Sequence, residues 1–164
     1  MEEILVDKGL SGLSRCFRKV IIESNKTGKL LFVGSPFTCL PFAEFLTYSI
    51  RDLPIKTYFS PNGDLDKIIE IIAKEGIGYT IGKIEGIKDF EIVVLLGGLA
   101  MPKSQVDPIL LKEKLEKVSK LDYVIGVCFQ GVMNRPEWID TFKFKYFIDS
   151  DISRVSLFKV RKND

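Results

Sequence analysis

Four short apolar runs in this sequence each break into a turn of small or turn-forming residues, and a segment with helical character follows each turn. Such runs are typical of buried strands, and strands that alternate with helices form parallel sheets. If these strands are parallel, their turns gather at the carboxyl edge of one sheet, where open α/β folds bind ligands. The runs at residues 30–33, 55–59, 92–96 and 123–129 lead into turns at residues 34–39, 60–64, 97–102 and 130–136.

The pattern predicts a three-layer α/β/α sandwich with a mainly parallel, Rossmann-like or flavodoxin-like sheet. Residues 11–24 predict an amphipathic N-terminal helix, because their apolar side chains recur at helical spacing. A mostly apolar helix over residues 40–50 is expected to have Thr38 or Cys39 as its N-cap. The reason is Pro41, since proline is tolerated only in the first turn of a helix.

The later elements are predicted from local signals. After Asp64, apolar residues recur at intervals of three and four, which predicts an amphipathic helix that ends at Gly76. One short strand is expected over residues 79–84. The pair Asp107-Pro108, an N-cap followed by proline at the first helical position, predicts a helix that reaches about Lys120.

The last part of the chain has a different pattern. Residues 143–160 alternate polar and apolar side chains, which predicts a hairpin or edge strands and gives the sheet an antiparallel C-terminal strand pair. No linker or low-complexity tract divides the sequence. We therefore expect residues 1–164 to form a single α/β domain.

The composition limits the class of partner. Hydrophobic residues make up 46% of the chain, which is typical of a globular protein. The net charge of +2 supplies no basic field for nucleic acid, and the apolar runs are too short to span a membrane. The acidic start, Met1-Glu2-Glu3, lacks the basic region of a signal peptide. We expect a cytoplasmic protein without nucleic-acid or membrane partners.

Histidine is absent, and this absence excludes Ser-His-Asp and Cys-His catalysis together with every histidine-containing metal site. The three cysteines, Cys16, Cys39 and Cys128, are far apart and show no paired spacing, which indicates free thiols. Carboxylates do not cluster in a metal-binding pattern either. The sequence therefore predicts no metal site, and it names no cofactor.

The turn after the first strand contains Gly34, Ser35, Thr38 and Cys39. Free backbone N–H groups at the start of the following helix favour an anion, and the two hydroxyls offer further hydrogen bonds. Cys39 is also a weak candidate for a reactive thiol, if it lies in the first helical turn. The alternatives are an ordinary turn with a capping threonine, and a cysteine that serves as a small apolar filler.

Two glycines, Gly97 and Gly98, follow the third strand directly. They allow either a positive φ or the close approach of a flat ligand to the backbone, although many loops use glycine only to bend. Arg135, in the turn after the fourth strand, is a plausible partner for an anion at the same edge; its other interpretation is a solvated loop charge. The sequence assigns no catalytic residue beyond the weak candidate Cys39.

The segments Gly34-Ser35-Pro36-Phe37-Thr38-Cys39 and Gly97-Gly98-Leu99-Ala100-Met101-Pro102-Lys103 together carry a resemblance. With both present, the chain resembles a small archaeal family, found chiefly in methanogens, that is catalogued only as a domain of unknown function. The resemblance covers most of the chain. It implies a compact cytoplasmic α/β protein and brings no activity or catalytic residue to transfer.

Three hypotheses for function follow. The first is a site for a small anionic or nucleotide-like ligand, formed by the two glycine-containing turns and Arg135. The second is a non-enzymatic module, most simply a homodimer, that buries the helix at residues 40–50 or the strands at residues 143–160. The third is a redox thiol protein, which would need Cys39 and Cys128 to be close enough to pair.

Overall fold

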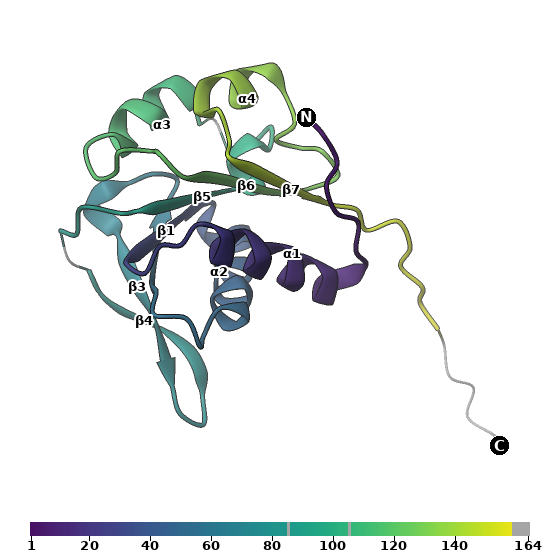
Figure 1. Ribbon diagram of the computed structural model, residues 1–164, viewed down its shortest axis with the longest axis horizontal. Helices are drawn as coiled ribbons and strands as arrows, with labels where there is room; N and C mark the ends of the chain where they lie inside the picture. Colours follow the sequence, from purple (N-terminus) through teal and green to yellow (C-terminus); the bar gives the residue numbers. More distant parts are fainter. Residues whose placement is uncertain (85, 105, 159–164) are drawn as a thin grey trace.

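Seven strands join one mixed sheet in the computed structural model, which describes residues 1–84, 86–104 and 106–158. The spatial order is β4-β3-β2-β1-β5-β6-β7 (Figure 1). The five strands β2, β1, β5, β6 and β7 pair in parallel with their neighbours. At the other edge of the sheet, β3 pairs antiparallel with β2, and β4 pairs antiparallel with β3. The strands are β1 (Lys29–Gly34), β2 (Lys56–Pro61), β3 (Ile69–Lys74), β4 (Gly78–Ile84), β5 (Ile92–Leu96), β6 (Val124–Phe129) and β7 (Tyr146–Ser150).

Helices cover both faces of the sheet and complete three layers (Figure 1). Helices α1 (Gly9–Glu23) and α2 (Pro36–Ser49) lie on one face. Helices α3 (Pro108–Leu115) and α4 (Pro136–Phe142) lie on the other. The prediction of an α/β/α sandwich with a mainly parallel sheet is therefore confirmed. None of the helices in the described part of the chain has the length and apolarity needed to cross a membrane.

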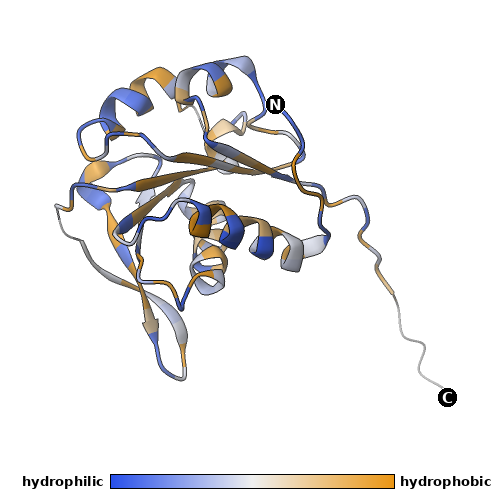
Figure 2. Ribbon diagram, viewed as in Figure 1, coloured by the Kyte–Doolittle hydropathy of each residue, from blue (hydrophilic) through white to orange (hydrophobic). Residues whose placement is uncertain are grey.

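The sheet divides the interior into two hydrophobic clusters, because successive side chains of a strand point to opposite faces. In β1, Leu30 and Phe32 belong to the cluster beneath α1 and α2, while Leu31 and Val33 belong to the cluster beneath α3 and α4. All four are fully buried. We call these two groups cluster 1 and cluster 2. Apolar colouring follows the sheet between the helices in Figure 2.

The predicted helix after Asp64 is wrong. The structure has a single 3₁₀ turn, η1 (Leu65–Lys67), and then β3, which forms a hairpin with β4. The repeating apolar positions there are isoleucines, and β-branched side chains favour a strand over a helix. Gly76 in the connection between the two strands and Gly78 at the start of β4 have positive φ values, a conformation that glycine adopts without strain.

The antiparallel pair is therefore the hairpin β3–β4 and does not lie at residues 143–160. The strand at that end, β7, pairs parallel with β6. The physical reason is α4, which connects these strands as a crossover, and a strand–helix–strand connection returns the chain in the same direction. Residues 151–158 form no strand, and residues 159 and 160 of the predicted hairpin lie outside the described residues.

Two helix boundaries also differ from the prediction. Helix α2 begins at Pro36 and has Ser35 as its N-cap, so that Thr38 and Cys39 lie inside the helix and Pro41 is accommodated within it. Pro36 at the first helical position explains this earlier start. Helix α3 has Asp107 as its N-cap, as the sequence indicates, but is shorter than predicted.

Candidate functional site

The connections of the sheet place a topological switch point between β1 and β5. From β1 the chain passes through α2 to β2 on one side, and from β5 it passes through α3 to β6 on the other side. Because β1, β2, β5 and β6 are parallel, the four predicted turns do meet at one edge of the sheet. A crevice outside the carboxyl ends of β1 and β5 is where sheets of this type bind ligands.

The two glycine-containing turns pack directly against each other at this point. A Cβ atom placed on Gly98 would overlap Sγ of Cys39 and lie 3.0 Å from Oγ1 of Thr38. A Cβ atom on Gly34 would overlap Cβ of Cys39 and lie 3.1 Å from Cβ of Leu96. The glycines are therefore required by close packing between protein segments. Neither glycine has a positive φ.

A third loop, from Gln130 to Arg135, closes the site on the β6 side. A Cβ atom on Gly97 would lie 2.7 Å from Cβ of Cys128 and 2.9 Å from Cγ1 of Val132. Gln130 and Gly131 both have left-handed backbone conformations, with φ of 54° and 66°. The carboxylate of Asp149 on β7 fixes this turn, because it accepts a hydrogen bond from the Gly131 N–H at 3.0 Å.

The three loops and the two helices of cluster 1 enclose a cavity of about 480 Å³. Its floor is apolar and its polar groups come from the loops and the start of α2. The apolar lining residues are Leu13, Phe42, Leu46, Leu96, Met101, Val127, Phe129 and Val132. The remaining lining residues are Thr38, Cys39, Gly97, Gly98, Gln130, Gly131 and Arg135.

Five of the seven predicted binding residues line this cavity: Thr38, Cys39, Gly97, Gly98 and Arg135. The other two, Gly34 and Ser35, do not. Gly34 is buried behind Cys39, and Ser35 is the N-cap residue that packs near Gly98.

Sequence reasoning missed the apolar walls of the cavity. Leu13 on α1 and Phe42 on α2 resemble ordinary core positions, and no local signal shows that they face an open space. The ring of Phe42 packs against that of Phe129 from β6, with centroids 4.7 Å apart. The one available signal was the unusually apolar character of residues 40–50, which indicates a helix that contacts other layers on several sides.

The electrostatics of the cavity are simple. Among the described residues that line it, Arg135 is the one that carries a formal charge, and its side chain is exposed at the rim. Thr38 and Gln130 are exposed there too. Helix geometry leaves the N–H groups of Phe37 and Thr38 without an intrahelical acceptor. The N–H of Cys39, in contrast, already donates to the Ser35 carbonyl at 2.8 Å.

The cysteines do not form a redox pair. Cys39 belongs to cluster 1 and Cys128 to cluster 2, so the sheet separates them, and both are free and buried. Burial raises the pKa of the Cys128 thiol to about 12, and the nearby charge of Asp149 adds to this effect. The third hypothesis therefore has no structural support. Within the described residues, no three histidine, cysteine, aspartate or glutamate side chains are grouped as a metal ion would require.

The fold and the cavity define a three-layer α/β protein with a candidate ligand site at the switch point of its sheet. The chain belongs to the family described as "Uncharacterized protein conserved in archaea (DUF2124)", whose model matches residues 8–153. This membership confirms the resemblance seen in the sequence.

The related proteins share most of their length with this chain. An uncharacterized protein from Methanocaldococcus jannaschii is 40% identical over 152 residues, which cover 93% of this chain and 91% of that protein. One from Methanothermobacter thermautotrophicus is 30% identical over 156 residues, 93% of this chain and 95% of that protein. A crystal structure of a protein of unknown function from the same organism has a TM-score of 0.85 at 28% identity and covers 97% of this chain and 99% of that one.

Proposed function

We propose that this protein binds a small molecule with an apolar body and an anionic group in the cavity between α1, α2 and the carboxyl ends of β5 and β6. The observation that carries this proposal is the cavity itself. Its volume of about 480 Å³ lies in the range of sites for small ligands and cofactors, and it opens at the switch point of the sheet.

The lining supports this class of ligand. An apolar floor with a few polar groups at the rim favours a ligand whose hydrophobic part enters first. Arg135 can then pair with an anionic group at the mouth, where the Thr38 hydroxyl and the Gln130 amide offer further hydrogen bonds. A nucleotide-like ligand fits this description when its base enters the cavity and its phosphate stays at the rim. The proposal is a binding function, and it assigns no reaction.

The proposal is tested with two matched probes. Anilinonaphthalene sulfonate has an aromatic body and one negative charge, and phenylnaphthylamine has a similar body without the charge. We expect the sulfonate to bind to the folded protein and raise its Tm. A screen of nucleotides, flavins and sugar phosphates by the same measurement would then narrow the natural ligand. If no probe and no compound of the screen changes the Tm, the binding proposal is wrong.

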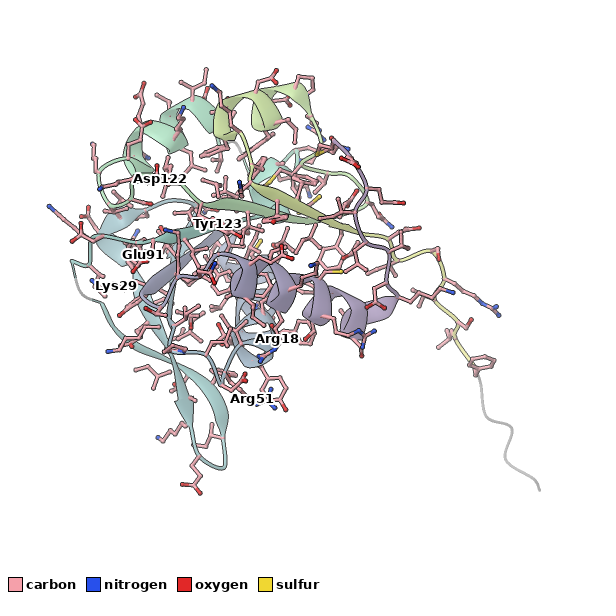
Figure 3. The ribbon with its side chains drawn as sticks, viewed as in Figure 1. Arg18, Lys29, Arg51, Glu91, Asp122 and Tyr123 are labelled. Carbon is pink, nitrogen blue, oxygen red and sulfur yellow. The ribbon has the colours of Figure 1, made fainter. Side chains whose placement is uncertain are left out.

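Arg135→Gln tests the role of the rim cation. An exposed charge pair contributes about 1 kcal/mol, so this variant should bind the sulfonate about fivefold more weakly and bind the neutral probe unchanged. Arg51→Gln is the matched control, because Arg51 follows the far end of α2, close to Arg18 in Figure 3. Equal effects of the two substitutions would show that Arg135 is not the partner of the anion.

Association of two copies is a second candidate function, and we propose a cytoplasmic homodimer. One observation favours it: residues 151–158 carry four apolar side chains that are between 52% and 97% exposed in the single chain. Helix α2, the other candidate surface, is less suited to the role, because its apolar residues Ala43 and Leu46 are already buried in cluster 1. Sedimentation that shows only a monomer at high micromolar concentration would contradict this second proposal.

A further inference from the structure

The segment at residues 151–158 leaves the end of β7 and extends away from the rest of the molecule (Figure 1). Its four apolar residues are well exposed: Ile152 at 52%, Val155 at 87%, Leu157 at 97% and Phe158 at 82%. Apolar colouring reappears along this segment in Figure 2. Exposed apolar groups gathered in this way mark an interaction site more often than a solvated surface.

The strand from which this segment leaves has an open edge. Among the described strands, β7 is the last in the sheet and pairs with β6 on one side only. Tyr146 and Ile148 pack against cluster 1 and Phe147 against cluster 2, yet all three are only partly buried. Edge strands are commonly protected by lysine, proline or a bulge, and β7 has no lysine or proline. A further strand on this edge would complete the burial of its side chains.

Acidic and basic side chains are separated along this stretch of the chain. Asp149 and Asp151 lie at the end of β7 and directly after it. Arg154, a basic residue, lies further along the segment. A surface with an acidic half and a basic half is complementary to itself under a two-fold rotation, which is the requirement for an isologous dimer interface.

We propose that two copies of this chain exchange residues 151–158, so that the segment of each copy adds as an antiparallel strand to the β7 edge of the other. The inference deepens the proposed self-association and is independent of the cavity. A second copy is favoured over the same chain, because no turn or bend occurs between Asp151 and Phe158. Without such a turn, the segment does not return to its own β7 edge.

Hydrogen exchange measured by mass spectrometry on the full chain tests this proposal at low and at high micromolar concentration. We expect the amides of residues 151–158 to exchange about tenfold more slowly at high concentration, because these residues form no strand in the single chain and strand pairing protects them only in the dimer. Protection that is equal at both concentrations would mean that the segment folds on its own chain and would overturn the proposal.

The same experiment distinguishes a dimer that forms through another surface from a chain that does not dimerise. Sedimentation gives the oligomeric state of the same samples. A dimer in which residues 151–158 stay unprotected would overturn the strand exchange while leaving self-association intact. A chain that stays monomeric at both concentrations would overturn both.

Substitutions locate the contact. The double variant Val155→Asp with Leu157→Asp should raise the Kd of the dimer at least about tenfold, because charges replace apolar groups in the new strand pair. Its folding should be unchanged, since both side chains are exposed in the single chain. The control is Ile109→Asp with Leu110→Asp, two apolar residues on α3 that are also exposed, at 60% and 58%. An equal loss of dimer in the control would contradict the proposed surface.

A charge reversal provides a test by rescue. Arg154→Asp and Asp151→Arg should each weaken the dimer, and the two substitutions together should restore it, because complementary charges face each other again across the two-fold axis. A double variant that dimerises no better than either single variant would show that the two charged halves do not meet.

Discussion

Gly98 has no room for a Cβ atom, because Sγ of Cys39 occupies that space. This contact joins the turn after β5 to the start of α2 and holds the two sides of the switch point together. Gly98→Ala should therefore destabilise the protein by about 1–3 kcal/mol, the usual cost of overpacking. Urea denaturation measures the change in the free energy of unfolding.

A second substitution at Cys39 tests whether its contact with Gly98 causes this loss of stability. Adding Cys39→Ala to Gly98→Ala should recover part of the lost stability, because the smaller side chain removes the overlap. Gly86→Ala is the control, since a Cβ atom there meets nothing within 4 Å. If Gly98→Ala is as stable as Gly86→Ala, the two turns do not pack as closely as described.

Asp149 should stabilise the rim of the cavity through the loop at Gly131. Its carboxylate accepts hydrogen bonds from the Gly131 N–H and, at 3.3 Å, from Sγ of Cys128. Asp149→Ala should cost about 1 kcal/mol and weaken binding of the sulfonate probe, whereas Asp149→Asn keeps an acceptor oxygen and should lose less. Asp122→Ala is the control, because Asp122 lies just before the amino end of β6, whereas the cavity lies at the carboxyl ends of the strands (Figure 3). Equal losses in both alanine variants would contradict this role.

The stability of the protein should fall in acid between about pH 4 and pH 2. Hydrogen bonds from Arg15 and Arg18 lower the pKa values of Asp7 and Asp52 from 3.8 to about 2. A carboxylate whose pKa is lowered in the folded state stabilises that state above the unfolded pKa, and this stabilisation is lost as the pH falls toward the folded pKa. Urea midpoints measured across this range should decrease steadily.

Two variants identify the source of the acid sensitivity. Asp7→Asn and Asp52→Asn should each flatten the pH profile, while Asp140→Asn, an exposed carboxylate on α4, serves as the control. Between about pH 5 and pH 8 we expect a plateau, because the chain contains no histidine to titrate there. Unchanged profiles in both variants would mean that these ion pairs do not contribute.

The thiols should react slowly in the folded protein. Cys39 and Cys128 are 4% and 0% exposed, and burial raises the pKa values of Cys16 and Cys128. Because the thiolate is the reactive form, a chromogenic disulfide at neutral pH should release little colour until urea exposes all three thiols. Mass mapping of the modified peptides assigns any early reaction. A fast reaction at Cys39 would contradict its burial and support the alternative of a reactive thiol.

The sequence was sufficient for the parallel part of the fold, because its buried strands are unbroken apolar runs followed by strong turns. The pair Asp107-Pro108 predicted the start of α3 because helix capping is also a local interaction. The Asp107 carboxylate accepts hydrogen bonds from the N–H groups of Ile109 and Leu110. Asp107→Ala should accordingly cost about 1 kcal/mol in urea denaturation, and Asp107→Ser should retain most of that stability. Equal stability of the alanine and wild-type proteins would show that this cap contributes nothing.

Of the hairpin β3–β4, the sequence predicted β4 as a strand over residues 79–84, but β3 was predicted as a helix. Its isoleucines recur at helical intervals, and only pairing across the hairpin decides in favour of strands. The sequence predicted that the turns lining the cavity meet at one edge of the sheet, but it did not predict the apolar walls. Its turns are local and visible in the sequence, whereas Leu13 and Phe42 reach it from separate helices through tertiary packing. Hence the sequence indicated an anion site, and the structure adds an apolar interior.

The division of the interior by the sheet has a consequence for how this protein can change. The cavity belongs to cluster 1, while α3, α4 and the buried Trp138 belong to cluster 2. Substitutions on opposite sides share few neighbours, so their effects on stability should add. The two sides of the sheet can therefore change independently: substitutions that reshape the cavity on one side leave the packing of the other side intact.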